Sequence, residues 1–211
     1  LVAYNGALIG QWQEGEFRVL QDIPIVAADV VALIALMEQS FPAVSIGLYA
    51  GKDWYVAQRN QWVELEASIT GEDPLVTDFE VFLAQKPVVH KFLLIGEEAD
   101  ITQLLAFLQE QDFPETSFYL SKANYLEITH RSVSKGHALA LLAEMQGLPI
   151  RETLAFGDHF NDLSMLEAAG VGVAMGNAPQ AVREAADAVT ADNHHNGVSL
   201  YLERVLLSET R

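Results

Sequence analysis

The 211-residue sequence contains no cysteine and few basic residues, and it lacks a hydrophobic run long enough to cross a bilayer. The absence of cysteine excludes disulfides and thiolate chemistry, which is compatible with a cytoplasmic protein. Only 12 lysines and arginines stand against 29 acidic residues, so the formal net charge is −17. Nucleic acids and anionic membranes are bound by basic surfaces, and we therefore expect neither as a partner. The longest apolar run, Val30 to Met37, is too short to span a membrane.

Half of the residues are hydrophobic, which is enough for a sizeable core and argues against disorder. The middle of the chain predicts a mixed α/β region with several hairpins and none of the candidate chemical motifs. From Ser134 onward, strand and helix patterns alternate regularly, which predicts a parallel sheet. Residues 1–9 are expected to form a short strand and a turn at Asn5-Gly6, and a hairpin is expected around residues 51–53. Strands are expected at 17–21, 44–49, 54–57, 88–95, 117–120, 125–129, 154–157 and 171–175, and helices at 26–39, 61–69, 101–108, 134–146 and 163–169. Ser134 is expected to cap the helix that runs to Gln146, and Gly147 is expected to end it.

The most informative stretch runs from Thr153 to Leu166. It begins as a short apolar strand, breaks at Gly157 and continues with apolar residues at helical spacing. Asp158 and Asp162 therefore lie in a turn at the carboxyl end of a parallel strand, where ligands bind in open α/β sheets. A Mg²⁺ ion needs only one or two carboxylates in such a place. Acidic pairs are common in so acidic a chain, and an alternative role for Asp162 is to complement a helix dipole.

A lysine and an asparagine accompany these acids. Lys135 lies at the start of a predicted helix, where the helix dipole disfavours a cation unless an anion shares the site. We therefore expect Lys135 to bind phosphate; the alternative is an ordinary exposed lysine. Asn161 lies inside the acidic turn and can donate its amide to the same phosphate, and its alternative role is that of a helix cap.

Other polar residues point to simpler roles. The glycines at 170, 172 and 176 flank a strand in the wrong order for a dinucleotide loop. His194 and His195 lie near Asp192 without a third zinc ligand at suitable spacing, which favours a solvated loop. His159 is interpreted as an exposed loop histidine and Asn177 as the cap of a helix reaching about Ala186. Trp54 and Trp62 are possible substrate contacts, but core packing is the better interpretation.

Several of these segments together carry a family resemblance. The sequence Gly157-Asp158-x-x-Asn161-Asp162 resembles motif IV of the haloacid dehalogenase (HAD) superfamily, and Ser134-Lys135-Gly136 resembles its motif III. Tyr4-Asn5-Gly6-Ala7, Val173 to Ala178 and Asn196-Gly197-Val198 extend the likeness to the Cof-type phosphatases, whose cap is of type IIB. The resemblance implies an α/β fold with a Rossmann-like core, formed by residues 1–13 and 131–211, and an inserted α/β cap domain at 14–130.

One departure from that family concerns the nucleophile. The family's Asp-x-Asp-Gly-Thr segment on the first strand is not found, nor is the Ser/Thr motif that follows it. We expect two β-α units, roughly 60 residues, to precede Leu1 in the natural protein.

The resemblance implies Mg²⁺-dependent hydrolysis of a small phosphorylated metabolite, such as a sugar phosphate, through an aspartyl-phosphate. Asp158 and Asp162 are then the metal residues, with Asp162 supporting either the metal shell or Lys135. Lys135 and Asn161 hold the phosphate. Two other functions stay open: a non-catalytic binding protein that retains the phosphate site, and a sugar phosphomutase.

Overall fold

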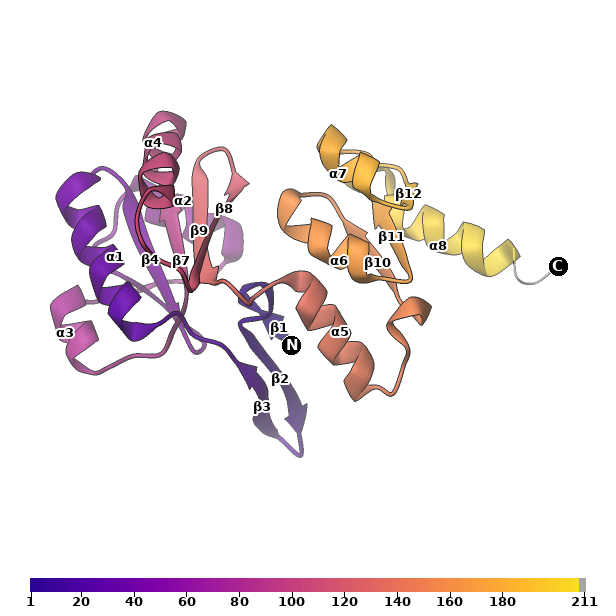
Figure 1. Ribbon diagram of the computed structural model, residues 1–211, viewed down its shortest axis with the longest axis horizontal. Coiled ribbons are helices and arrows are strands. Elements are labelled where there is room, and N and C mark those ends of the chain that lie inside the picture. Colours follow the sequence, from indigo (N-terminus) through magenta and orange to yellow (C-terminus); the bar gives the residue numbers. More distant parts are fainter. Residues whose placement is uncertain (209–211) are drawn as a thin grey trace. The chain divides into compact units, whose positions relative to one another are not determined.

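The structure is a computed structural model that describes residues 1–208 (Figure 1). The chain divides between Val133 and Ser134 into two compact units, unit 1 before this point and unit 2 after it. Residues 1–13 belong to unit 1. Their assignment to the same domain as residues 131–211 stays a prediction, as does the cap at 14–130.

Unit 1 contains a six-stranded sheet in the order β6-β5-β4-β7-β9-β8. All neighbouring strands are antiparallel except β5 and β6, and the expected hairpins β4–β5 and β8–β9 are present. The strand β6 was not expected, because two residues are too short to show a pattern. The strands are β4 (Ser45–Ala50), β5 (Asp53–Val56), β6 (Leu75–Val76), β7 (Val89–Ile95), β8 (Thr116–Lys122) and β9 (Tyr125–His130).

Alternation along these strands sends one set of side chains into a large apolar core. Leu48, Phe92, Leu94, Leu126 and Ile128 are fully buried in it, together with apolar residues of α1, α3 and α4. The short helix α3 was also missed from the sequence. The helices of unit 1 are α1 (Ala27–Ser40), α2 (Gln61–Thr70), α3 (Phe79–Ala84) and α4 (Glu98–Gln109).

The first residues of unit 1 form a separate antiparallel sheet, β1-β2-β3, with a long β2–β3 hairpin (Figure 1). The predicted turn at Asn5-Gly6 is present as the 3₁₀ turn η1, in which Tyr4, Asn5 and Gly6 all have positive φ. The elements are β1 (Val2–Ala3), η1 (Tyr4–Gly6), β2 (Leu8–Gln13) and β3 (Glu16–Asp22).

Unit 2 confirms the predicted strand-helix alternation. Among its described residues, three parallel strands lie in the order β10-β11-β12, and one small core cluster consists mainly of alanines with Leu166 and Val182. The elements are α5 (Lys135–Met145), η2 (Ile150–Glu152), β10 (Leu154–Gly157), η3 (Phe160–Asp162), α6 (Leu163–Ala168), β11 (Val171–Ala174), α7 (Gln180–Ala185), β12 (Ala188–Val189), η4 (Asn193–His195) and α8 (Gly197–Ser208).

Two helix boundaries in unit 2 test the capping predictions. Helix α5 begins after Ser134, whose Oγ accepts a hydrogen bond from the His137 N–H (3.1 Å), and it is followed by Gly147 at a φ of 66°. Both features were predicted. The prediction that Asn177 caps α7 was wrong, because Pro179 lies at the N-cap and the helix begins at Gln180.

Within residues 1–208, no helix combines the length and the apolar composition that a bilayer span requires.

Candidate active site

The side chain of Asp162 is the centre of the candidate site. It is only 4% exposed, and its Oδ1 lies 2.5 Å from the Lys135 Nζ. Its Oδ2 accepts hydrogen bonds from the backbone N–H groups of Asp158 (2.9 Å) and His159 (3.1 Å). Both oxygens are thus engaged, and the geometry gives Asp162 a direct contact with Lys135. Its role as a metal ligand stays a prediction, and direct ligation would need a further lone pair of one of these oxygens.

Gly157 allows the turn that follows β10 to pack closely against the Asp162 side chain. A Cβ added to Gly157 would lie 2.4 Å from the Asp162 Cβ, far inside normal contact distance. The strand β10 must therefore end on a residue without a side chain if Asp162 is to reach the N–H groups that follow.

A second close approach brings Lys135 to Asp162. The N–H of Gly136 donates to the Ser164 Oγ (3.2 Å), and a Cβ on Gly136 would lie 2.3 Å from the Ser164 carbonyl oxygen. The N-terminus of α5 therefore packs directly on α6. This packing joins two motifs that are 27 residues apart in the sequence.

Asp158 follows the last residue of β10 and is exposed, in contrast to Asp162. Asn161 lies within the turn η3 between Phe160 and Asp162, half-buried, so neither α6 nor η3 uses it as an N-cap. His159 is half-buried as well, against the prediction of an exposed side chain. Its ring lies edge-on to Phe160, and its buried Nδ1 has no hydrogen-bond partner among the described residues.

Asn177 contacts the candidate site residue Asp158, a contact that the sequence interpretation did not predict. Its Nδ2 donates to the Asp158 Oδ2 (2.9 Å), and its Oδ1 accepts from the Asn193 N–H (3.1 Å). The signal was available, because Asn177 follows β11, the parallel neighbour of β10, and residues that follow adjacent parallel strands meet at one edge.

The turn η4, which contains Asn193, His194 and His195, is stabilised by Asp192. The Asp192 Oδ1 caps η4 by accepting from the N–H groups of His194 and His195, and it lies 2.6 Å from the His195 Nδ1. The hydrogen bond from the His195 side chain is the main reason that the pKa of Asp192 is lowered from its ordinary value. The His195 side chain therefore stabilises η4 through its contact with Asp192.

The residues present fit part of a Mg²⁺ site. Asp158 offers an exposed carboxylate whose Oδ1 has no protein partner within residues 1–208, and hard oxygen donors suit Mg²⁺. No cluster of three or more His, Asp or Glu side chains in the described part of the chain could hold a metal ion alone. A single carboxylate is sufficient only if water, substrate or further protein groups supply the remaining ligands.

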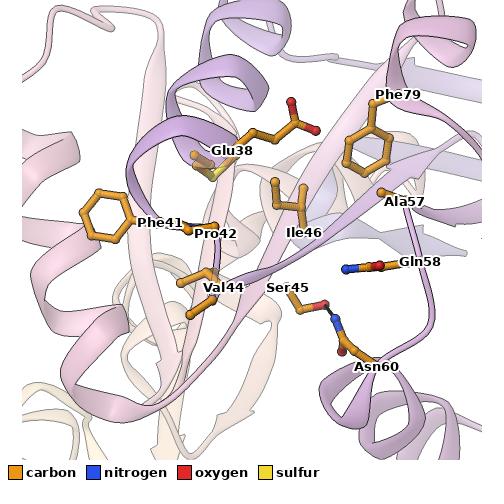
Figure 2. Close-up of a pocket in the computed structure, with 12 residues that line it drawn as sticks. Glu38, Phe41, Pro42, Val44, Ser45, Ile46, Ala57, Gln58, Asn60 and Phe79 are labelled. Carbon is orange, nitrogen blue, oxygen red and sulfur yellow. Dashed lines mark hydrogen bonds between the residues drawn. The ribbon is translucent and has the colours of Figure 1, made fainter.

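A pocket of about 180 Å³ in unit 1 lies among residues of α1, β4 and the β5–α2 connection (Figure 2). Its best-placed polar groups satisfy each other, because the Asn60 Nδ2 donates to the Ser45 Oγ (3.2 Å) while the Asn60 Oδ1 caps α2. None of the residues predicted to bind phosphate or metal lines it. We interpret this pocket as a packing feature of unit 1.

Comparison with known proteins identifies the family of this chain. Residues 1–202 match the haloacid dehalogenase-like hydrolase family, and the chain belongs to this family. A Haemophilus influenzae protein named as a candidate phosphatase is 36% identical over 204 residues, which are 96% of this chain and 74% of that protein.

Solved structures of the same class share the fold. A haloacid dehalogenase-like hydrolase from Bacteroides thetaiotaomicron has a TM-score of 0.82 at 29% identity, covering 96% of this chain and 74% of its own. A HAD subclass IIB sugar phosphatase has a TM-score of 0.77 at 25% identity, covering 95% of this chain and 73% of its own. The predicted HAD-like α/β fold and the likeness to type IIB proteins are confirmed.

Proposed function

We propose that the natural protein is a Mg²⁺-dependent phosphatase that hydrolyses small phosphomonoesters, with sugar phosphates as the first class to test. The single observation that carries this proposal is the ion pair between the half-buried Lys135 and the buried Asp162, which follows the exposed Asp158 at the carboxyl end of β10. Membership of a hydrolase family with relatives named as phosphatases supports it.

Each residue then has a distinct task. Asp162 neutralises and orients Lys135, whose Nζ retains donors that can bind phosphate oxygens. Asn161 adds an amide donor to the same phosphate. Asp158 supplies one carboxylate oxygen to Mg²⁺, which when bound offsets the negative charge of the transferring phosphoryl group.

The nucleophile of this proposal is an aspartate outside the present sequence. Its attack on phosphorus would break the ester bond between phosphorus and the substrate oxygen, which releases the alcohol and forms an aspartyl-phosphate. Attack of water on this intermediate would then release inorganic phosphate and restore the aspartate carboxylate. The relatives are compatible with this, because the chain spans about three quarters of their length. In addition, β10 pairs only with β11 among the described strands, which leaves its other edge open for a further strand.

The test measures phosphate release from a panel of small phosphomonoesters by the full-length natural protein, with Mg²⁺ and with EDTA. We expect EDTA to abolish turnover and Asp158→Asn to lower it by about 10³-fold, the upper range for losing one preorganised electrostatic group. Glu167→Gln, an exposed carboxylate change on α6, is the matched control and should retain full activity.

Two results would overturn the proposal. If turnover is unchanged by EDTA and by Asp158→Asn, Asp158 does not bind a metal ion that the reaction needs. Binding of a sugar phosphate without any phosphate release would favour the non-catalytic alternative, and isomerisation of a hexose phosphate would identify a mutase.

A further inference from the structure

The Asn177 side chain is held at both ends by hydrogen bonds. Its amide oxygen accepts from the Asn193 N–H and its amide nitrogen donates to the Asp158 Oδ2. A flip of the amide would place an NH₂ group against an N–H and a carbonyl against a carboxylate, so both bonds would be lost. The network therefore fixes which end of the amide faces Asp158.

The fold places this amide through two features. Gly157 at the end of β10 is paired in parallel register with Ala174 at the end of β11, so the residues that follow both strands emerge together. Gly176 then packs against the loop before η4, donating its N–H to the Ala191 carbonyl (3.2 Å). A Cβ at this glycine would lie 2.9 Å from the Asp192 nitrogen. The close approach brings Asn193 within reach of Asn177.

We propose that Asn177 is a positioning residue that makes Asp158 a one-oxygen ligand and thereby favours Mg²⁺ over Ca²⁺; this inference rests on the proposed function. The hydrogen bond takes one lone pair of Oδ2 and fixes the orientation of the carboxylate, while Oδ1 has no protein partner in the described part of the chain and is the freer of the two oxygens. A carboxylate that offers one oxygen suits Mg²⁺, which demands near-octahedral geometry. Ca²⁺ also accepts bidentate carboxylates and more ligands.

Loss of the Asn177 amide has two expected consequences. The Asp158 carboxylate becomes free to rotate, so the Mg²⁺ affinity falls by about tenfold, the lower range for removing a partner of a metal ligand. Ca²⁺ can use both freed oxygens, so its affinity falls less. The ratio of the two dissociation constants therefore moves toward Ca²⁺.

The experiment is calorimetric titration of the full-length natural protein with Mg²⁺ and, separately, with Ca²⁺. Wild type is compared with Asn177→Ala and with the matched control Gln180→Ala. The control removes another exposed amide-to-carboxylate hydrogen bond, from the Gln180 Nε2 to the Glu184 Oε1 (2.7 Å), which has no contact with Asp158. Circular dichroism checks that each variant is folded, and the Mg²⁺ concentration for half-maximal turnover should rise with the Mg²⁺ dissociation constant.

The outcomes separate this inference from the proposed function. Asp158→Asn is titrated alongside. If it abolishes Mg²⁺ binding while Asn177→Ala leaves binding unchanged, or weakens both ions equally, the positioning role is overturned and the proposed function stands. If Asp158→Asn has no effect on Mg²⁺ binding, both are overturned. A selective loss of Mg²⁺ affinity in Asn177→Ala, absent from Gln180→Ala, supports the inference.

Discussion

The two units of the chain are stabilised in different ways. Unit 1 buries one large cluster of leucine, isoleucine, valine, methionine and phenylalanine side chains between its sheet and its helices. The core of unit 2 is a small group of alanines with one leucine and one valine. Its elements approach so closely at glycines that a single methyl group would collide with the opposite backbone, as at Gly136 and Gly172. The largest apolar cluster therefore lies in unit 1, whereas the contacts described for unit 2 include several close backbone approaches at glycines.

The two units also differ in the polar groups that accompany their ion pairs. In unit 1, Lys91 and Glu127 lie on adjacent strands with their charges 3.3 Å apart, and the Tyr119 hydroxyl donates to the same glutamate. That network is satisfied within the unit. In unit 2, Asp162 pairs with Lys135 and accepts from the Asp158 N–H, whereas the Asp158 Oδ1 has no partner within residues 1–208 and is the metal ligand in the function that we propose.

The largest expected effect comes from the core of unit 1. Phe92 is completely buried, and Phe92→Ala should lower the free energy of unfolding by about 3–5 kcal/mol, because it removes apolar contacts and leaves a cavity. All three tryptophans, Trp12, Trp54 and Trp62, lie in unit 1. Urea unfolding followed by tryptophan fluorescence therefore measures this unit selectively.

The matched control is Val31→Ala on the outer face of α1, where the valine is 52% exposed. Its effect should stay within about 0.5 kcal/mol. Similar losses for the two variants would contradict the view that burial in this one cluster stabilises unit 1.

An intermediate effect is expected at the close approach of α5 and α6. In Gly136→Ala, the new methyl group meets the Ser164 carbonyl oxygen, which should cost about 1–3 kcal/mol of stability. The shift also moves Lys135 from Asp162. Because a displacement of about 1 Å can lower a rate by about 10²-fold, phosphate release by the full-length protein should fall by that order.

Gly147→Ala, just beyond the other end of α5, is the control. Gly147 has a φ of 66° and open space where a Cβ would lie, so alanine should cost about 1–2 kcal/mol through backbone strain alone. Its turnover should be unchanged. Equal turnover in both variants would show that the close packing at Gly136 does not position Lys135.

The sequence predicted the two units unequally well. In unit 1 the long strands and helices followed from hydrophobic periodicity, whereas β6 and α3 are too short for a period to appear. Trp54 is buried, as its aromatic character suggested. The polar contacts of this unit, such as that between Lys91 and Glu127, depend on strand register, and a single sequence does not encode register as a local pattern.

In unit 2, Lys135, Asp158, Asn161 and Asp162 were named from the pattern of strand, glycine, acid and helix and from its resemblance to HAD motifs. The structure brings Lys135 and Asp162 into contact, and the binding roles of the four residues stay predictions. Asn177 was misassigned because a polar residue shortly before a helix has the local signature of a cap. Its contact with Asp158 arises from the parallel pairing of β10 with β11, which is a tertiary property.

The smallest expected effect concerns the loop that holds Asn193 in unit 2. The folded pKa of Asp192 lies below its ordinary value, chiefly because of the His195 side chain, so the charged carboxylate stabilises the fold. This stabilisation is fully present above the ordinary pKa and is lost as the pH falls through the lower folded value. Carbon-13 NMR titration should show that His195→Ala raises the pKa of Asp192, because it removes a side-chain hydrogen bond. His194→Ala should leave this pKa unchanged, because His194 contacts Asp192 only through its backbone N–H, which the substitution retains. An Asp192 that titrates identically in wild type and His195→Ala would show that the His195 side chain does not stabilise the Asp192 carboxylate, which would leave the backbone N–H groups of His194 and His195 as its partners in η4.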